Sequence, residues 1–289
     1  MYYALIMLSV VMFGGCFALQ DLFRKMRGSS LAVSMEAACV GGVAGIIILF
    51  ATSGFKLEYS NFTLILAFIA AVNSVLLTYC SFKALDVINL SLFSLFLMLG
   101  GMVLPFVQGI LFYDEPFTVA KGVCVAFITA ALALTVTKDE KQKKGYIYYI
   151  AIFIMNGLSG VFTKLFNELP YEKTSEAGYS IWLALWTVVI SGIIWLVYII
   201  KKNKDVRSFT VKSALVSVAN GGINNFANYL LVIAIAFIPS SVQYPLITGG
   251  VMIVSTLICF FGDRKPNKRE LISVALAFLG MLALFIIPI

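Results

Sequence analysis

The chain has 289 residues, of which 61% are hydrophobic and 12% charged, and its formal net charge is +7. Soluble domains are about 45–50% apolar and about 25% charged, so this composition excludes an ordinary soluble domain and indicates a protein embedded in a lipid bilayer. The sequence contains no histidine and no phosphate-binding loop motif. These absences exclude a histidine-ligated metal site, a Ser-His-Asp triad and ATP-driven work by this chain alone. We expect neither enzymatic activity nor a cofactor.

Apolar stretches of about the 20 residues that cross a ~30 Å hydrocarbon core recur from one end of the sequence to the other. They predict an all-α membrane protein with ten transmembrane helices and almost no residues left for a soluble domain. The predicted spans are 2–23, 30–52, 61–83, 87–112, 118–137, 145–166, 177–200, 211–235, 240–262 and 268–288. The first span lacks a basic leading segment and a small-residue cleavage site, so we interpret it as a retained helix.

The basic residues are distributed unevenly between the predicted loops. Seventeen of the 21 lysines and arginines follow odd-numbered spans, among them Arg24, Lys25 and Arg27. Cytoplasmic loops carry an excess of such residues, so these loops are predicted to be cytoplasmic and both termini extracytoplasmic. The positive charge therefore reflects topology. A nucleic-acid site would gather basic residues and aromatics on one folded face, so we expect no nucleic-acid partner.

Two distant segments of the chain have the same pattern. Residues 100–116, GGMVLPFVQGILFYDEP, and residues 249–266, GGVMIVSTLICFFGDRKP, each begin with a glycine pair and end at an acidic break. The pattern predicts two five-helix repeats, residues 1–138 and 145–289, joined by a basic linker at 139–144. Because five is odd, the second repeat must be inverted in the membrane. Inverted repeats are typical of secondary transporters that alternate access to a site near the midplane.

An aromatic residue and an alanine occur near the end of the third helix of each half, Tyr79 with Ala84 and Tyr229 with Ala234. In each half the fourth helix ends in an acidic break before a fifth helix rich in glycine and alanine. In these features the chain resembles the EamA-type drug/metabolite transporter superfamily, although FYDEP and FFGDRKP stand where that family usually has a Gly-Glu pair. The resemblance implies a ten-helix carrier in which the first four helices of each half surround the cavity. Many relatives keep both termini inside, unlike the orientation predicted here.

The eighth span contains the clearest candidates for substrate binding. Asn220, Asn224 and Asn228 recur every four residues and so share one helix face. Polar groups in hydrocarbon are costly and tend to face a cavity or another helix. The three amides are therefore expected to line the site, or alternatively to join helix to helix. Further candidates for substrate contact are Asn73, Tyr79, Asn156, Trp182 and Tyr229.

Glu36 is the most unusual ionisable residue, because it lies about two turns into the second span with no basic residue within a helical turn. A buried carboxyl group without a cation suits a proton-coupling site or a counter-ion for an amine. The alternative is a carboxylate near the interface that water satisfies. Trp182, one turn from Trp186, is either half of an aromatic box or an interface anchor. Asp21 is interpreted as an interface ion pair with Arg24 and Lys25.

The sequence thus predicts a secondary active transporter in the plasma membrane that moves a small polar or amphipathic metabolite or drug by alternating access. Its expected partners are this substrate and the bilayer, with protons as the coupling ion to test. We expect a monomer, and a homodimer stays open. One alternative is proton-coupled efflux of cationic compounds. Another is a lipid flippase or a membrane receptor without transport activity.

Overall fold

The structure is a computed structural model that describes all residues except 1, 115, 136–139, 202–209, 236–239 and 287–289, with the backbone alone at 140–144, 232, 235, 240–245 and 285. The described part is all-helical and contains no strand. Its helices are α1 (Tyr2–Arg27), α2 (Leu31–Thr52), α3 (Asn61–Val87), α4 (Leu90–Phe112), α5 (Val119–Leu134), α6 (Glu140–Glu168), α7 (Glu176–Ile200), α9 (Val211–Ile235), α10 (Ser240–Phe260) and α11 (Lys268–Ile286). The predicted all-α class is confirmed for the described residues.

Polar residues at the predicted breaks set the ends of several helices. Asn89 accepts a hydrogen bond from the Leu92 N–H at the start of α4, and Ser175 accepts one from the Gly178 N–H at the start of α7. These are N-caps, which satisfy an orphan donor of the first turn. Gly28 ends α1 with a φ of 92°, a conformation that glycine adopts without steric cost. The helix α6 begins at Glu140, so the segment 140–144 of the predicted linker is helical.

Six helices in the described part are long and apolar enough to cross a membrane: α1, α2, α3, α4, α6 from Gly145, and α7. Their length and composition indicate a multi-pass membrane protein. Two shorter apolar helical segments are Val119–Leu134, which is α5, and Leu246–Phe260, which is part of α10.

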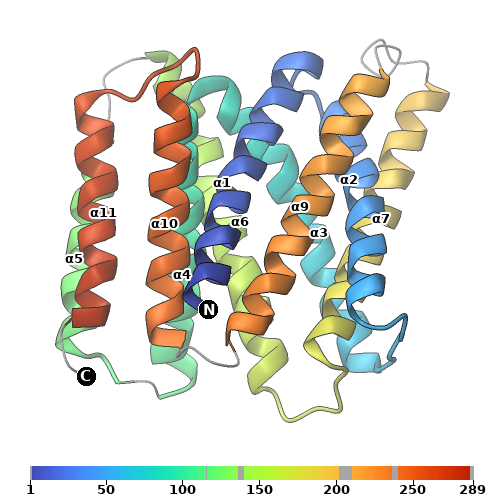
Figure 1. The fold of residues 1–289 in the computed structure, drawn as a ribbon, viewed down its shortest axis with the longest axis horizontal. Coiled ribbons are helices and arrows are strands. Elements are labelled where there is room, and N and C mark those ends of the chain that lie inside the picture. The colour runs from blue at the N-terminus through green and yellow to red at the C-terminus, as the bar shows by residue number, and fades with distance from the viewer. Residues whose placement is uncertain (1, 115, 136–139, 202–209, 236–239, 287–289) are drawn as a thin grey trace.

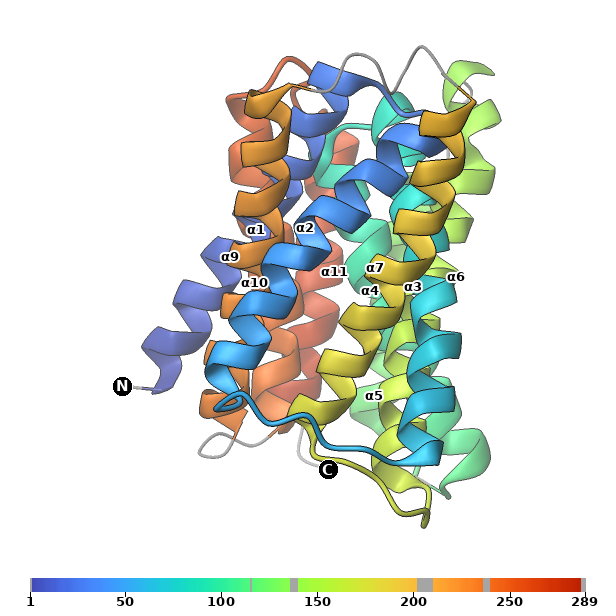
Figure 2. The same ribbon diagram turned by 90° about the vertical axis from the view of Figure 1, so that its right-hand side faces the viewer.

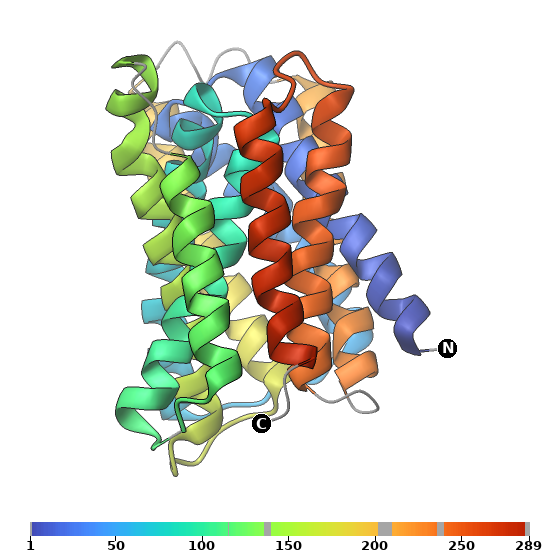
Figure 3. The same ribbon diagram turned by 90° about the vertical axis from the view of Figure 1, so that its left-hand side faces the viewer.

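Eight helices pack in a closed ring in the order α1, α9, α2, α7, α3, α6, α4, α10. Figure 2 shows α2 between α9 and α7 on one side of this ring. The remaining two helices, α5 and α11, pack on each other outside the ring, beside α10 and α4 (Figure 3). In this order α6 and α9 occupy opposite positions, and each lies between two other ring helices.

The helices alternate in direction, so successive connections lie at opposite ends of the bundle (Figure 1). The connections α1–α2, α3–α4 and α10–α11 lie at the upper end of Figure 1, together with the basic residues Arg24, Arg27, Lys83 and Arg264. We call this the basic end. The connections α2–α3, α4–α5 and α6–α7 lie at the opposite end, as do the start of α1 and the end of the described part of α11.

Candidate functional site

The asparagine stripe of α9 points away from the outer surface of the helix. The outer face is marked by Leu215, Val218 and Phe226, whose side chains are 62%, 43% and 41% exposed. At about 100° per residue, the stripe of Asn220, Asn224 and Asn228 lies roughly on the opposite side. The helices α1 and α2 pack on α9 from the two flanks, so the stripe faces the interior of the ring.

The members of the stripe have different environments. The Oδ1 atom of Asn220 is buried without a hydrogen-bond partner among the described residues. Asn228 is exposed, and its Nδ2 donates to the backbone oxygen of Asn224 at 3.0 Å. The adjacent Asn225 lies on another face, where its Nδ2 donates to the Gly221 oxygen at 2.9 Å and packs against Gly45 of α2. Asn225 therefore does not share the helix face of the three-residue stripe.

Two further predicted residues meet at α6, on the opposite side of the ring. Asn73 of α3 donates through Nδ2 to the Met155 oxygen at 2.8 Å and to Ser159 Oγ at 3.0 Å. Asn156 of α6 donates through Nδ2 to the Leu97 oxygen of α4 at 2.7 Å. Both amides therefore join helices, as the alternative interpretation of such residues expects. Each does so with its nitrogen, and the Asn73 Oδ1 is buried without a hydrogen-bond partner among the residues that the structure describes.

The aromatic candidates lie apart from the asparagines. Tyr229 is about 100° around α9 from Asn228, and its ring lies 6.2 Å from that of Phe226 on the outer side. Tyr79 stacks under the ammonium group of Lys83 at 6.0 Å. Trp182 donates its indole N–H to the Glu58 backbone oxygen at 2.8 Å, which anchors the α2–α3 connection to α7. None of these three contacts involves the asparagine stripe.

Glu36 has a cationic partner that its local sequence does not reveal. Its side chain forms an ion pair with Arg27, the last residue of α1, and the two side chains are 1% and 2% exposed. Arg27 Nε donates to Glu36 Oε1 at 3.2 Å, and Arg27 Nη2 donates to Oε2. The expectation of a carboxyl group without a nearby cation is therefore corrected: the turn at Gly28 places the end of α1 beside the start of α2.

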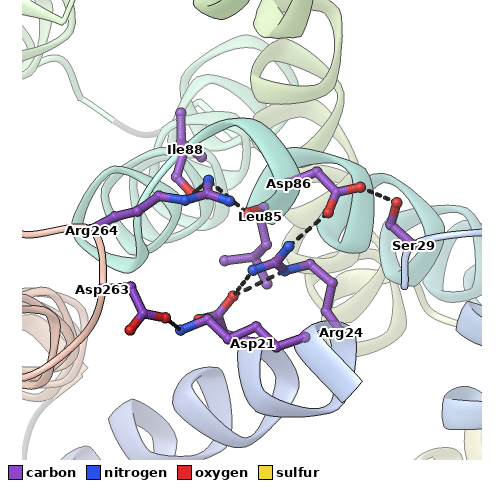
Figure 4. Close-up of polar contacts among 9 residues, drawn as sticks. Asp21, Arg24, Ser29, Leu85, Asp86, Ile88, Asp263 and Arg264 are labelled. Carbon is purple, nitrogen blue, oxygen red and sulfur yellow. Dashed lines mark hydrogen bonds and ion pairs between the residues drawn. The ribbon is translucent and has the colours of Figure 1, made fainter. Parts of the chain in front are cut away.

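A polar network joins three parts of the basic end (Figure 4). Arg24 of α1 donates to Asp21 at 2.7 Å and to Asp86 of α3 at 2.7 Å, so the predicted pairing of Asp21 is confirmed and extended. Lys25 donates to Asp263 at 2.7 Å, and this hydrogen bond holds the pKa of Asp263 below its ordinary value. Residues of this network line a cleft of about 200 Å³.

The α10–α11 connection is tied to the α3–α4 junction by further bonds in the same region. Arg264 donates to the Leu85 and Ile88 backbone oxygens, each at 3.2 Å (Figure 4). Asn89 donates to Glu270 of α11 at 2.6 Å. Apart from the pairing of Asp21 with Arg24, we did not predict this network, because its members come from helix ends and connections far apart in the sequence. The sequence signal that could have indicated it is the occurrence of acidic residues among the basic residues that follow odd-numbered spans.

Comparisons with known proteins show the fold alone. No protein-family model matches the chain, and no curated protein matches it. A solved structure described as "Crystal structure of protein" superposes with a TM-score of 0.60 at 16% sequence identity, over 97% of this chain and 99% of that one. The arrangement of helices along almost the whole chain is therefore one that a protein of known structure also has. Within the described residues, no group of three histidine, cysteine or acidic side chains could hold a metal ion.

Proposed function

We propose that this chain is a secondary active transporter with ten membrane spans, built as two inverted five-helix repeats of the EamA-type drug/metabolite architecture. The observation that carries the proposal is the exchange of packing partners between the halves. If α1, α2, α3, α4 and α5 correspond to α6, α7, α9, α10 and α11, the contact of α1 with α9 corresponds to that of α6 with α3. Likewise α1 packs on α10 as α6 packs on α4, and α2 on α9 as α7 on α3. Such correspondence supports a pseudo-twofold axis.

The repeated glycines agree with this correspondence. A Cβ added to Gly101 in α4 would lie 2.5 Å from Asn156 of α6, and a Cβ added to Gly250 in α10 would lie 2.8 Å from Val10 of α1. In each half, a glycine of the duplicated segment thus allows the fourth helix to approach the first helix of the other half. Close packing alone also favours small residues at these positions, so the support comes from the equivalent partners and not from the glycines themselves.

Alternating access requires a polar site in the ring and contacts at an end that can break and reform. The stripe on α9 and the amides around α6 supply polar groups near the middle of opposite helices. The ion pair Lys25–Asp263 and the bonds of Arg264 to Leu85 and Ile88 join the two proposed halves at the basic end. We propose that this network closes the cytoplasmic end and opens when the halves rock.

The pairing of Glu36 with Arg27 bears on the rival proposal, proton-coupled efflux of cationic compounds. That proposal rested on a carboxyl group without a cation, and the ion pair removes this support. A flippase or a receptor has no specific observation in its favour. The proposed location is the plasma membrane with both termini extracytoplasmic.

A ligand panel scored by thermal stabilisation, followed by counterflow in proteoliposomes, tests the proposal. A ligand at 100 times its Kd stabilises the folded state by about 2.7 kcal/mol, so a true substrate gives a measurable shift. The stabilising compound should then exchange across the membrane in a saturable, protein-dependent manner. Binding of compounds without any exchange would contradict transport and favour a receptor.

A further inference from the structure

We infer that the cleft at the basic end binds the phosphate group of an anionic phospholipid, whose acyl chains lie on the adjacent outer surface of α1 and α10. Such a site depends on the cleft and on the membrane-spanning helices, and not on the proposed transport activity. The size of the cleft, the charges that line it and the exposed apolar side chains beside it support this assignment.

The cleft is formed where the last turns of α1 meet the α3–α4 junction and the α10–α11 connection. Its volume is about 200 Å³, and its apolar walls include Ala18 and Leu22 of α1, Leu85 near the end of α3, and Phe261 after α10. Pockets that enclose a drug-sized ligand measure about 300–1,000 Å³. The cleft therefore has room for a small group such as a phosphate, and a larger ligand must leave the rest of its structure outside.

Three basic and two acidic side chains line the cleft, which leaves an excess of one positive charge. They are Arg24, Lys25, Arg264, Asp21 and Asp263. Arg24 is already occupied, because its Nε and Nη2 donate to Asp21 Oδ1 at 3.0 and 2.7 Å and its Nη1 donates to Asp86 at 2.7 Å. The Arg24 side chain is only 8% exposed. Arg24 and Asp21 thus satisfy each other and leave the ligand to the remaining side chains.

The two other cations are accessible to a ligand. The ammonium group of Lys25 lies 2.7 Å from Asp263 and 3.3 Å from Asp21, and the side chains of Lys25 and Asp263 are 37% and 82% exposed. Exposed ion pairs are weak and are screened by salt, so a competing anion can take the place of Asp263. Arg264 is exposed, and in the described part of the chain it forms no ion pair with a carboxylate.

The Arg264 guanidinium is held in place by backbone groups. Its Nη1 donates to the Leu85 and Ile88 oxygens, each at 3.2 Å (Figure 4). These bonds use one of its three nitrogens and leave its positive charge without an opposite charge. A phosphodiester has one negative charge and two free oxygens, so it accepts from Arg264 and Lys25 together. A cationic ligand would face the excess positive charge of the cleft.

Exposed apolar side chains continue from the cleft along the outer surface. Leu22 and Phe261 line the cleft and are 44% and 93% exposed. Leu257 lies one turn before Phe261 on the same side of α10 and is 55% exposed. Because α1 and α10 pack on each other, these side chains offer acyl chains a surface next to the cleft. A free phosphate would not use this surface, and anionic lipids are concentrated in the cytoplasmic leaflet, at the end proposed to be cytoplasmic.

The test compares dioleoylphosphatidylglycerol, dioleoylphosphatidylcholine and inorganic phosphate. Binding of each to the purified full chain in one neutral detergent is measured by thermal shift and by native mass spectrometry. We expect phosphatidylglycerol to bind at least about fivefold more tightly than phosphatidylcholine, the factor that one basic side chain near an anionic surface contributes. Equal binding of the two lipids would overturn the inference. Stabilisation by inorganic phosphate equal to that by phosphatidylglycerol would assign the cleft to a soluble phosphate compound and overturn the lipid site.

Two variants should change the binding of phosphatidylglycerol in opposite directions. Arg264→Gln removes the cation without an acidic partner and should raise the Kd about fivefold. Asp263→Asn removes the carboxylate that competes for Lys25 and should lower the Kd about threefold, the range of one exposed ion pair. A merely structural role would weaken binding in both variants. Because the Asp263 side chain is 82% exposed, Asp263→Asn decides the question even where Arg264→Gln does not fold.

Arg269→Gln is the matched control, because Arg269 lies in the first turn of α11 at the same end of the bundle but outside the cleft. Its charge is screened from the bound headgroup, so the Kd should change by less than about twofold. An equal loss of binding in Arg269→Gln and Arg264→Gln, or unchanged or weaker binding to Asp263→Asn, would overturn the inference. Failure of the lipid site would leave the proposed transport standing, because that proposal is tested by exchange of solute.

Discussion

Glu36→Gln tests whether the buried pair of Glu36 with Arg27 is structural or carries a coupling proton. Both side chains are almost fully inaccessible, at 1% and 2% exposure. Glutamine keeps the shape of the side chain but removes the negative charge that pairs with the buried Arg27 guanidinium. Breaking a buried pair by changing one member costs about 3–5 kcal/mol, so the free energy of unfolding should fall by about this amount.

The assay compares the unchanged protein, Glu36→Gln and a double variant in one detergent by equilibrium unfolding. The double variant combines Arg27→Met with Glu36→Leu, which removes both charges and approximately conserves volume. Replacing a whole buried pair by packed apolar residues is neutral or stabilising by about 1–4 kcal/mol, so this protein should recover the stability that Glu36→Gln loses.

Transport measured with and without a pH gradient completes this experiment. If the pair is structural, the Glu36→Gln protein that remains folded should keep the pH dependence of uptake. A Glu36→Gln protein with unchanged stability that no longer responds to the pH gradient would refute the reasoning, because it would assign the coupling proton to this carboxyl group.

Three further predictions rest on particular contacts, and a fourth rests on the distribution of basic residues. Gly221→Ala should destabilise the protein by about 1–3 kcal/mol in thermal unfolding, because its Cβ would overlap the Gly41 backbone, whereas Gly222→Ala, with open space around it, should not. The Ser175 N–H donates to Glu58 and lowers the pKa of this carboxyl group. The bond therefore stabilises the protein above the ordinary pKa of 4.5, and this stabilisation is lost as the pH falls through the lowered value. Glu58→Gln should make the melting temperature less dependent on pH in that acidic window. Asp86→Asn removes a partner of Arg24 and should increase thiol labelling of a cysteine introduced at Leu85, while Asp114→Asn at the opposite end should not. A reporter fused after Ile289 should be extracytoplasmic and labels at residues 201–207 cytoplasmic; a cytoplasmic C-terminus would contradict the orientation derived from the basic loops.

Most of the helical structure could be predicted because the apolar stretches are long and the breaks between them are polar. The span predicted at 211–235 coincides with α9, and the asparagine stripe was visible because residues four apart share a helix face. The first span was predicted to end at residue 23, but α1 continues to Arg27, since Arg24 finds acidic partners at the end of the bundle. Hydropathy alone gives no weight to such pairing.

The partners of the polar residues could not be predicted in the same way. Arg27 and Glu36 are nine residues apart, on two helices, and only the turn at Gly28 brings them together. Asp86, near the end of α3, and Asp263, in the α10–α11 connection, reach α1 from positions that are remote in the sequence. Gln108 carries no periodic signal, and the burial of its Oε1 atom without a partner in the described part of the chain becomes evident only when its surroundings are known.

At two helix contacts, a glycine of one helix lies against an asparagine side chain of the next helix. A Cβ on Gly101 would lie 2.5 Å from the Nδ2 of Asn156, and a Cβ on Gly45 would overlap the Nδ2 of Asn225. A glycine on one helix thus makes room for an amide on the next. At α6 this space lets Asn156 donate to the Leu97 carbonyl, one turn before Gly101 on α4. Close packing of α4 on α6 and the orientation of the Asn156 amide therefore have the same cause, the absence of a side chain at Gly101.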